Sequence, residues 1–595
     1  MKIDVFEYLN QRVMYSRDVN YYVGIQKDNI GIGEHELSEE DFLRIFKEND
    51  PEEFEVFSRS SIAQRQEKMN TIDLEEIKEE STKGQFTLCL HPSRKCNLNC
   101  KYCFKDSEYL GNEELSFQVA KDAIDFLVDI YAPGASKYVV DLSGSGEPLL
   151  QFGLIREIVE YCKQKRNEVC KNIEVMFCTN LTLLTPEMVA YLDNEPAIIL
   201  GTSIDGDQIT HDGNRVYASG GGTYADVVKG LNMFQKKKLG IAVTITPLNQ
   251  DVDLIYDHLY RLPNVDCVSM NLIRCFNGTN YDFENFDIPY LISRYQKLCN
   301  KILKELEIGN FDYLHKLLQG ADFFSGFIIQ ALFQNTMNLY KCDAGKNRIS
   351  VSSTGDIYAC SVMTGNKDFY IGNIYLGTNT DAQNKFFLPN ITLNVKCIKC
   401  DLNILCGGEC YVNAYQKNEN FFDPLGNLCK LKRELIKLSR SLVQRIKLEC
   451  PEIYCRLLNF ACHMQSHFTT DPWIWAVMKF LKSRGYQTDF ETIQKEFAHC
   501  NTVGASPVDV LNCIKKYVDA DAYKVDFASD KNKLQERLKG PAIGVINKTK
   551  NSRYQYLIVL GTADGIILFT EIGRNGQAQM LLQTFLKECS DLFLF

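Results

Sequence analysis

Ten of the 23 cysteines in this 595-residue chain fall into two spacing patterns, and these constrain the fold more than any other feature. The first pattern is Cys96-x3-Cys100-x2-Cys103. The second is an array of seven cysteines, which comprises Cys342, Cys360, Cys397, Cys400, Cys406, Cys410 and Cys429. Three thiolates hold three corners of a four-iron cluster and leave the fourth iron open to a ligand. The first spacing therefore predicts a reactive cluster.

The bulk composition excludes several classes of protein. The formal net charge is −10 and no basic stripe is present, so a nucleic-acid partner is not expected. The first residues lack the apolar segment of a secretory signal, and no apolar run approaches the ~18 residues that span a bilayer. A long chain of this kind favours a reducing, cytoplasmic setting with thiolates committed to metal over a disulfide scaffold.

From about residue 85 the chain alternates between strand and helix patterns. The expected strands cover residues 85–90, 137–142, 173–178, 198–203, 241–246 and 267–273. Amphipathic stretches with apolar residues every three or four positions lie between them. Six such units predict an α/β fold with a parallel sheet, either an open doubly wound sheet or a partial barrel. Periodicity alone does not choose between the two.

The rest of the chain is less regular. Residues 41–48 follow a helix start signal, residues 349–360 read as a hairpin around Gly355, and residues 430–448 form a basic amphipathic helix. A final region is expected to begin with helices at 474–484, 490–497 and 507–518. Strands at 541–546, 556–560 and 566–569 follow.

The first cysteine group resembles the cluster motif of radical S-adenosylmethionine (SAM) enzymes, with Tyr102 at the usual aromatic position. A zinc site is the alternative. The segment Ser-Gly-Ser-Gly-Glu-Pro after the second strand resembles the Gly-Gly-Glu-Pro motif of that family. The resemblance implies that Ser145, Gly146 and Glu147 contact SAM, with Glu147 facing its ammonium group. A glycine-rich turn with a solvated Glu147 is the other reading.

Two further strand ends resemble the same family. Asn180 lies where radical SAM enzymes have Thr-Asn-Gly, although Leu181 replaces the glycine. Residues 203–215 resemble the Ser-Ile-Asp-Gly stretch of peptide-modifying members, which implies SAM contacts for Ser203 and Arg215. His211 is expected to be structural, because no nucleophile accompanies it. All four segments follow carboxyl ends of expected parallel strands, where α/β folds build their sites.

The resemblance, which covers about residues 85–310, implies a partial (β/α)6 barrel. It also implies that SAM binds the open iron. One electron from the reduced cluster would then cleave a carbon–sulfur bond of SAM. The products are methionine and a 5′-deoxyadenosyl radical, which abstracts hydrogen from an unactivated carbon. No general acid or base is identified.

The second cysteine group matches the SPASM domain, a loop-rich region that accompanies peptide-modifying radical SAM enzymes. The match implies two auxiliary [4Fe-4S] clusters. One is expected to use Cys397, Cys400, Cys406 and Cys429, and the other Cys342, Cys360 and Cys410. Asp343 is a candidate fourth ligand for the latter, which otherwise keeps an open iron. A pair of zinc knuckles is the alternative.

Residues 461–595 resemble the papain-type peptidase domain of bacteriocin exporters, which cuts after double-glycine leaders. The expected nucleophile position falls near Asp471, and the chain has no histidine after His499. Proteolysis is therefore not expected. A degenerate, α+β papain-like domain that binds the leader is predicted instead; a merely stabilising appendage is the alternative.

These observations predict five regions: a possible recognition element at 1–84, the barrel at 85–315, the SPASM region at 316–435, a helical linker at 436–460 and the papain-like domain at 461–595. We expect a radical SAM enzyme that crosslinks or epimerises a ribosomally made peptide. Its partners would be a precursor with a double-glycine leader and a flavodoxin- or ferredoxin-type electron donor. The rivals are an anaerobic sulfatase-maturing enzyme, a non-catalytic metal scaffold or leader-binding adaptor, and an active leader protease.

Overall fold

The computed structural model describes residues 1–26, 30–58, 84–103, 114–274, 279–333, 338–388 and 390–465. Beyond residue 465 it describes residues 488–497, a few isolated positions and the strands of a C-terminal sheet.

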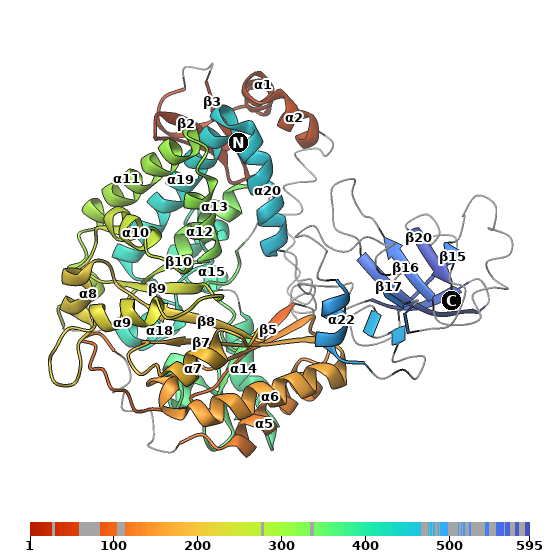
Figure 1. Ribbon diagram of the computed structural model, residues 1–595. Helices are drawn as coiled ribbons and strands as arrows, with labels where there is room; N and C mark the ends of the chain where they lie inside the picture. Colours follow the sequence, from red (N-terminus) through yellow and green to blue (C-terminus); the bar gives the residue numbers. More distant parts are fainter. Residues whose placement is uncertain are drawn as a thin grey trace.

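Six parallel strands form the centre of the molecule (Figure 1). They are β5 (Gln85–Cys89), β6 (Lys137–Asp141), β7 (Asn172–Thr179), β8 (Ile198–Ser203), β9 (Leu239–Ile245) and β10 (Val265–Leu272). Each strand pairs with its neighbour in the chain, from β5 at one side to β10 at the other. A doubly wound sheet reverses its strand order, so this sequential order identifies a partial barrel. All six expected strands are confirmed.

Helices in the crossovers bury an apolar stripe against the strands. They are α5 (Phe117–Asp125), α6 (Phe152–Val169), α7 (Pro186–Leu192), α8 (Gln208–Asn214), α9 (Tyr224–Leu231) and α10 (Val252–Tyr260). In α6 the residues Ile155, Ile158, Val159 and Cys162 recur at helical spacing and are fully buried. Cys170 ends that helix in the left-handed conformation, with φ of 50°.

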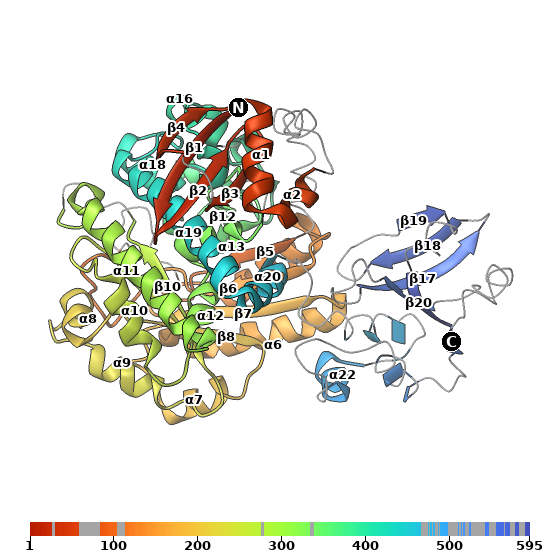
Figure 2. The ribbon, with the colours of Figure 1, turned by 90° about the horizontal axis from the view of Figure 1, so that it is seen from above.

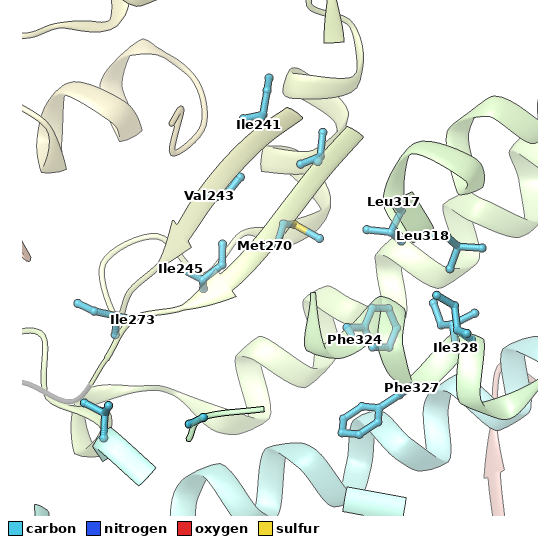
Figure 3. Packing of buried hydrophobic residues seen from close by; sticks show 14 of the residues in the cluster. Ile241, Val243, Ile245, Met270, Ile273, Leu317, Leu318, Phe324, Phe327 and Ile328 are labelled. Atoms are coloured by element: carbon cyan, nitrogen blue, oxygen red, sulfur yellow. The ribbon is translucent and has the colours of Figure 1, made fainter. Parts of the chain in front are cut away.

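Three helices follow β10 and cover the end of the sheet. They are α11 (Ile288–Glu307), α12 (Phe311–Gln319) and α13 (Phe323–Ala331). Figure 3 shows apolar side chains of β9, β10, α12 and α13 gathered in one packed region, with Met270 and Leu317 among them. The carboxylate of Asp322 caps α13 and accepts the Met270 amide at 2.9 Å, which ties this helix to β10.

The sheet does not stop at β5. Strand β11 (Arg348–Val351) pairs with β5 in parallel, and the antiparallel strands β12 (Asp356–Tyr358), β13 (Tyr370–Asn373) and β14 (Gly377–Thr378) extend it to ten strands. The expected hairpin between β11 and β12 is confirmed. Gly355 turns it with φ of +84°, a conformation that glycine adopts without a steric penalty.

Short helices and loops carry the second cysteine group. They are α14 (Thr380–Phe387), α15 (Asn390–Leu393), α16 (Val395–Ile398), α17 (Asn403–Cys406) and α18 (Tyr411–Asn418). The long helix α19 (Gly426–Glu449) then runs into α20 (Pro451–Gln465). Helix α19 contains the amphipathic helix expected at 430–448, and it packs against α11 and α13.

The first residues form a small sheet that the sequence did not reveal. Strands β1 (Lys2–Tyr8), β2 (Gln11–Ser16), β3 (Tyr21–Ile25) and β4 (Gly33–Glu36) lie in the order β3-β2-β1-β4. Helices α1 (Glu39–Asn49) and α2 (Pro51–Phe57) follow, and α1 contains the helix expected at 41–48. Figure 2 shows α1 beside this sheet. Phe6 and Val13 face the main core, whereas Val5 and Met14 pack with Phe42 and other residues of α1 and α2. Strand β3 is buried throughout, so it shows no alternation for a sequence reading to detect.

The C-terminal region contains a separate antiparallel sheet, which stands apart from the main body in Figures 1 and 2. Its strands are β15 (Tyr523–Lys524), β16 (Ala542–Ile546), β17 (Gln555–Ala563), β18 (Ile566–Glu571), β19 (Ala578–Leu581) and β20 (Cys589–Leu594). The three expected strands are confirmed, as is helix α22 (Phe490–Glu496). The guanidinium of Arg166 lies 4.3 Å from the Phe490 ring, which joins α22 to the end of α6. The helices expected at 474–484 and 507–518 lie largely outside the described residues.

No helix within the described ranges is long and apolar enough to cross a membrane.

Candidate active site

Four segments that carry candidate site residues meet at one edge of the sheet. The loop with Cys96, Cys100 and Cys103 follows β5, Ser145 to Glu147 follow β6, Asn180 follows β7, and Ser203 ends β8. These strands pair as parallel neighbours, so their carboxyl ends lie side by side. The structure thus brings together the segments that the sequence selected separately.

The cysteine loop is held by the residues on either side of Arg215. The amide of Asn99 donates to the Val216 carbonyl at 2.8 Å, and the amide of Lys101 donates to the Asn214 carbonyl at 2.9 Å. All three thiols of the loop are partly buried. The backbone that presents Cys100 is therefore fixed before any ligand binds.

The electrostatic setting of this loop suits thiolate ligands. Burial alone would lower the pKa of Arg215, but Asp205, Tyr102 and Cys100 together raise it above its usual value. A buried cation near Cys100 favours the thiolate form of that residue. The amide of Leu98 also donates to Cys96 Sγ at 3.4 Å. Three partly buried thiols on a braced loop beside a guanidinium fit a [4Fe-4S] cluster with one open corner.

Two glycines allow the loop after β6 to lie against the cysteine loop. Gly146 has φ of +81°, and a Cβ there would meet the carbonyl oxygens of Ser93 at 2.4 Å and Lys95 at 2.6 Å. A Cβ on Gly144 would meet His91 Nδ1 at 2.3 Å. The small residues here were expected to let a ligand approach the backbone closely. In the structure their immediate neighbours are the cysteine loop and the residues that precede it.

Glu147 is buried at the centre of this edge, with 2 % of its surface exposed. Its Oε1 accepts hydrogen bonds from the Thr179 hydroxyl at 2.5 Å and the Leu149 amide at 3.1 Å, and its Oε2 accepts from the Asn180 amide at 2.9 Å. Burial raises the pKa of Glu147, while these bonds oppose the rise. A carboxylate accepts about four hydrogen bonds, so Oε2 keeps capacity for one further donor. The alternative reading, in which Glu147 is exposed to solvent on a glycine-rich turn, is therefore excluded.

Asn180 connects β7 to the cysteine loop. Its side-chain amide donates to Asn97 Oδ1 at 2.9 Å, and its Oδ1 accepts from the Thr182 hydroxyl at 2.7 Å. The next residue, Leu181, has φ of +59°. That is the left-handed conformation that the glycine of the Thr-Asn-Gly motif suits, so the backbone keeps the turn although the residue differs.

Asp205 is a site residue that the sequence analysis did not select. It is fully buried, and its Oδ2 accepts hydrogen bonds from Tyr102 Oη at 2.5 Å and Arg215 Nε at 3.0 Å. The Arg215 guanidinium lies 5.3 Å from the Tyr102 ring. Three residues from two motifs thus form one buried unit beside Cys100. Asp205 follows the expected site residue Ser203 by two positions. This proximity is the sequence feature that could have identified Asp205 as a site residue.

Ser203 lies at the end of β8, beside Cys178. The Ser203 hydroxyl and the Cys178 thiol are 3.4 Å apart. The Cys178 amide donates to the Ser143 hydroxyl at 3.0 Å, which links the ends of β6 and β7. Ser203 therefore shares this edge with the other SAM candidates.

His91, which directly follows β5, was also missed. Its Nδ1 accepts the Ser145 amide at 2.9 Å, so its Nε2 carries the proton and lies 3.0 Å from the Ser350 hydroxyl and 3.1 Å from the Thr364 hydroxyl. Burial lowers the pKa of His91 to about 4, which keeps the ring neutral. His91 therefore links the loop after β6 to β11 and the cysteine-rich region.

His211 is fully buried and structural, as expected. Its Nδ1 accepts the Asp205 amide at 3.3 Å, and its Nε2 lies 2.9 Å from the Thr223 hydroxyl. Burial lowers its pKa to about 4. The ring therefore fixes the backbone of Asp205 and is closed to solvent.

The seven remaining cysteines interact in two groups. Cys342, Cys360 and Cys410 interact with one another. Burial is the main cause that raises the pKa of Cys342 and of Cys360, and Cys410 adds to the rise in both. The same three thiolates raise the pKa of Arg274, Cys410 most strongly. Cys397 interacts with Cys400 and Cys406, and Cys429 interacts with Cys397 and Cys406. This is the grouping that the SPASM resemblance implies.

Cationic side chains lie beside both groups, with Arg274 at the first and Lys432 and Arg433 at the second. Lys432 forms a buried ion pair with Glu409 at 3.3 Å and donates to the Gly408 carbonyl at 2.9 Å. Arg433 Nη1 lies 3.1 Å from Cys400 Sγ. Thiolate clusters carry net negative charge, so buried cations beside them fit the predicted ligand sets.

The thiols of the two groups interact, but they are not arranged as the ligands of a metal ion. Within the described ranges, no group of three or more Cys, His, Asp or Glu side chains is arranged as a formed metal site. Asp343, the candidate fourth ligand, is exposed, and its carbonyl accepts the Lys346 and Arg348 amides at 3.0 and 2.9 Å. The individual ligand assignments remain predictions.

Comparison with known proteins agrees with this geometry. Residues 90–257 match the family model described as the radical SAM superfamily. An uncharacterized protein of Methanocaldococcus jannaschii is 27 % identical over 310 residues, which are 52 % of this chain and 93 % of the relative.

Other relatives carry functional names. The radical SAM cyclopropyl synthase TigE of Paramaledivibacter caminithermalis is 25 % identical over 60 % of this chain and 73 % of its own length. A cysteine-type anaerobic sulfatase-maturating enzyme of Clostridium novyi is 22 % identical over 55 % of this chain and 87 % of its own length.

A solved structure supports the fold. The hexahistidine-tagged form of anSMEcpe with bound AdoMet superposes with a TM-score of 0.52 at 18 % identity, over 64 % of this chain and 100 % of the other. The strand order, the cysteine loop after β5 and the family match agree. The chain thus contains a radical SAM domain and is a radical SAM enzyme that uses SAM and a [4Fe-4S] cluster.

Proposed function

We propose that this enzyme matures a ribosomally synthesised peptide, installing a thioether or carbon–carbon crosslink or an epimerised residue. The observation that carries the proposal is that Cys410 acts on Cys342 and Cys360, whereas Cys406 acts on Cys397 and Cys429. These groups would hold two auxiliary clusters. A strand of the same region pairs with β5, so the first group lies on the continuation of the radical SAM sheet.

The residues of the strand-end edge have distinct proposed roles. Cys96, Cys100 and Cys103 would hold the reactive cluster, which would supply the electron for cleavage of SAM. Glu147 would use the free capacity of Oε2 for the ammonium group of SAM. Asn180, Ser203 and Arg215 would contact the rest of SAM, with Tyr102 and the backbone of Ser145 and Gly146 beside it. Arg215 would meet SAM already oriented by Asp205.

The regions outside the barrel complete the proposal. Residues 316–435 would be the auxiliary-cluster region, 436–460 the helical linker, and 1–84 a recognition element. Residues 461–595 would bind a double-glycine leader without cutting it. A flavodoxin- or ferredoxin-type protein would supply electrons, and the free cysteines of the described residues fit a reducing cytoplasm.

Maturation of a sulfatase, by oxidation of one residue to formylglycine, is a second candidate. It is supported by the relative of that name and by the same barrel. The two candidates differ in substrate. A sulfatase-maturing enzyme needs no precursor leader, whereas a peptide maturase acts on a short chain encoded for modification.

The test uses the anaerobically reconstituted full chain with SAM, a strong reductant and each candidate substrate. Formation of 5′-deoxyadenosine reports the radical step, and mass spectrometry of the substrate reports its fate. A crosslink removes two hydrogen atoms, epimerisation leaves the mass unchanged but alters acid-hydrolysis stereochemistry, and formylglycine exposes an aldehyde. Absence of 5′-deoxyadenosine from cluster-loaded protein would sink both candidates.

Iron and sulfide content separates these reactions from a metal scaffold. Three four-iron clusters predict about 12 iron atoms per chain, whereas zinc knuckles predict none at the second cysteine group. Leader binding is tested by titrating a double-glycine leader peptide into the full chain and into a chain lacking residues 461–595. Equal affinity for both forms, with SAM cleavage retained, would exclude the leader-binding role of that region. Cleavage after the double glycine would instead indicate a protease.

A further inference from the structure

The inner face of the barrel carries an arginine that none of the roles above uses. Arg348 lies on β11 opposite Thr87 of β5. Cys89 follows Thr87 by two positions and pairs with Asp141 of β6, so all four residues lie on one face of the sheet. Leu88, on the other face, belongs to the hydrophobic core beneath the helices. The face with Arg348 is therefore the one turned away from that core.

The Arg348 side chain reaches across β5 to the next strand. Its Nη1 lies 3.1 Å from Asp141 Oδ2 and 3.2 Å from Cys89 Sγ. Asp141 Oδ1 accepts the Ser143 amide at 2.9 Å, so this carboxylate is itself held in place. One side of the guanidinium is thus fixed by the protein.

The other side of the guanidinium has unused hydrogen-bond donors. A guanidinium carries five N–H groups, and Nη1 uses its two on Asp141 and Cys89. In the described part of the chain, no acceptor takes a hydrogen bond from Nε or Nη2 of Arg348. The side chain also keeps 39 % of its surface exposed. The remaining donors form the planar fork that binds both oxygens of a carboxylate.

A second arginine comes from the opposite margin of the barrel. Arg274 follows β10, which is the last strand on that side of the sheet. Arg274 is exposed, and its side chain forms no ion pair with the residues that the structure describes. Cys410 is the largest cause that raises the pKa of Arg274, and Cys89 is the largest for Arg348; Cys360 adds to both rises. Both guanidinium groups therefore lie within electrostatic reach of one thiol, that of Cys360.

This location lies between the candidate SAM site and the first auxiliary group. Asp141 precedes Ser143, whose hydroxyl accepts the Cys178 amide at 3.0 Å. The Cys178 thiol in turn lies 3.4 Å from the SAM candidate Ser203. On its other side Arg348 acts on Cys360. A peptide that meets both the radical and the auxiliary cluster passes this guanidinium.

Compensation of the auxiliary thiolates is the competing explanation for the two arginines. Glu409 also acts on Arg274, but this carboxylate is already paired with Lys432. Arg348 is a poor compensator for the thiolates, because its guanidinium contacts Asp141. Compensation needs only positive charge, so a lysine would serve it equally well. An intact fork is needed only by a planar anion.

We propose that Arg348 and Arg274 form an anchor that binds a carboxylate of the substrate peptide. Nε and Nη2 of Arg348 hold the two oxygens, and Arg274 adds positive charge from the other margin of the barrel. The carboxylate belongs to an aspartate or glutamate side chain or to the end of the peptide chain. That the ligand is part of the substrate rests on the function proposed above.

The test uses phenylglyoxal, which modifies arginine side chains, with mass spectrometry to locate each adduct. The cluster-loaded full chain is treated anaerobically in the presence of one of three probes. They are acetyl-Gly-Gly-Glu-Gly-Gly-amide, the same peptide with Gln in place of Glu, and acetyl-pentaglycine with a free carboxyl end. Arg156, exposed on α6, is the internal control and should react equally with every probe.

We expect a carboxylate probe to slow the modification of Arg348 and Arg274 at least about fivefold relative to the glutamine probe. Protection by the glutamate probe identifies a side-chain carboxylate as the ligand, and protection by the pentaglycine probe identifies a chain end. Equal rates with all three probes at both arginines would overturn the inference.

One variant separates the anchor from simple compensation of charge. Arg348→Lys keeps the positive charge but loses the fork. The probe concentration that halves the rate of Arg274 modification should rise at least about tenfold, whereas Arg156→Lys should leave it unchanged. If Arg348→Lys fails to fold or to load iron, Arg274→Lys is compared in the same way by the modification of Arg348. An unchanged concentration in a folded, loaded variant would refute the anchor and favour compensation.

Turnover distinguishes the anchor from the proposed function. If the parent chain and Arg348→Lys modify the precursor with the same KM, the anchor fails and the proposed function stands. If the parent chain modifies no peptide but a carboxylate probe protects both arginines, the anchor stands and the proposed function fails.

Discussion

Tyr102 Oη lies 2.5 Å from Asp205 Oδ2, and the same oxygen accepts Arg215 Nε at 3.0 Å. The phenol comes from the cysteine loop, the carboxylate from the end of β8, and the guanidinium from the end of α8. The pKa of Tyr102 is raised well above its usual value by burial, Asp205 adds to the rise, and Arg215 opposes it. The phenol therefore stays protonated and acts as a donor to the carboxylate.

Asp205→Asn should weaken both folding and SAM binding. It leaves the buried Arg215 without its counterion, and breaking a buried ion pair costs about 3–5 kcal/mol. We expect a lower free energy of unfolding, measured in denaturant, and a Kd for SAM raised about tenfold or more, measured by calorimetry.

Tyr102→Phe is the matched control for that change. It removes one hydrogen bond and keeps the ring against Arg215, so a loss of about 1–2 kcal/mol is expected. If Asp205→Asn behaves no worse than Tyr102→Phe, the carboxylate does not orient the guanidinium.

Gly146→Ala should disrupt the cysteine loop. The new Cβ would meet the Ser93 and Lys95 carbonyls at 2.4 and 2.6 Å, and the backbone there has φ of +81°. Backbone atoms cannot yield as a flexible side chain can, so reconstituted protein should lose the iron bound by Cys96, Cys100 and Cys103. Gly153→Ala, where no heavy atom lies within 4 Å of the added Cβ, should load normally. Full loading of both variants would contradict the close-contact explanation.

Acid should destabilise the fold through His91 and His211. Burial lowers both pKa values from 6.5 to about 4, so the folded state holds the rings neutral while the unfolded chain protonates them. The free energy of unfolding should fall as pH decreases from about 6.5 to 4, by about 1.4 kcal/mol per unit of pKa difference for each ring. Above pH 6.5 neither ring contributes.

The pH dependence can be assigned with one substitution. His211→Gln removes one of the two groups, so its unfolding free energy should depend less steeply on pH over the same interval, measured by urea unfolding of metal-free protein. A slope identical to that of the parent chain would show that His211 does not titrate in this way.

The two auxiliary groups should lose metal independently. Cys410→Ser removes a ligand from the group with Cys342, and Cys429→Ser removes one from the group with Cys397. Each variant should lose up to about four iron atoms, and the double variant about eight. Cys455→Ser, at an exposed cysteine outside both patterns, should lose none. Loss of all auxiliary iron from either single variant would indicate one shared site.

Lys432→Met should destabilise the protein more than its apolar packing suggests. Lys432 and Glu409 form a pair whose side chains expose 3 % and 0 % of their surface. Removing the cation breaks this buried ion pair, which costs about 3–5 kcal/mol, although the Glu409 carboxylate still accepts the Cys410 amide at 2.8 Å. The double variant Lys432→Met with Glu409→Leu should recover part of this loss in thermal unfolding. No recovery would indicate that Lys432 acts on the thiolates and not on Glu409.

The barrel was predictable because each strand is a short, apolar run between amphipathic helices. Strand β8 matches the expected range 198–203 residue for residue. The choice between an open sheet and a barrel was not legible, since it depends on which strands pair and not on their periodicity. The parallel pairing of β11 with β5 was likewise hidden, because Arg348 and Thr87 are far apart in the chain.

The candidate residues were found where a family motif marks them. Residues whose role depends on contacts between elements were missed, including Asp205 inside the Ser-Ile-Asp-Gly stretch. Cys96 and Glu147 belong to recognisable spacings, whereas His91 and Asp205 act through partners from other elements. Leu181 shows a different limit: the sequence departs from the family glycine, yet φ of +59° keeps the same turn. Backbone conformation there is imposed by the surrounding bonds of Asn180 and Thr182.

The pairing of β11 with β5 makes the cysteine-rich region part of the barrel's own hydrogen-bond ladder. A truncated barrel that ends near residue 315 would therefore leave the backbone groups along one side of β5 without their β11 partners and exposed to solvent. Such a fragment should precipitate or swap strands with its neighbours. A chimaera that exchanges the cysteine-rich region between relatives should therefore keep β5 and β11 from the same parent.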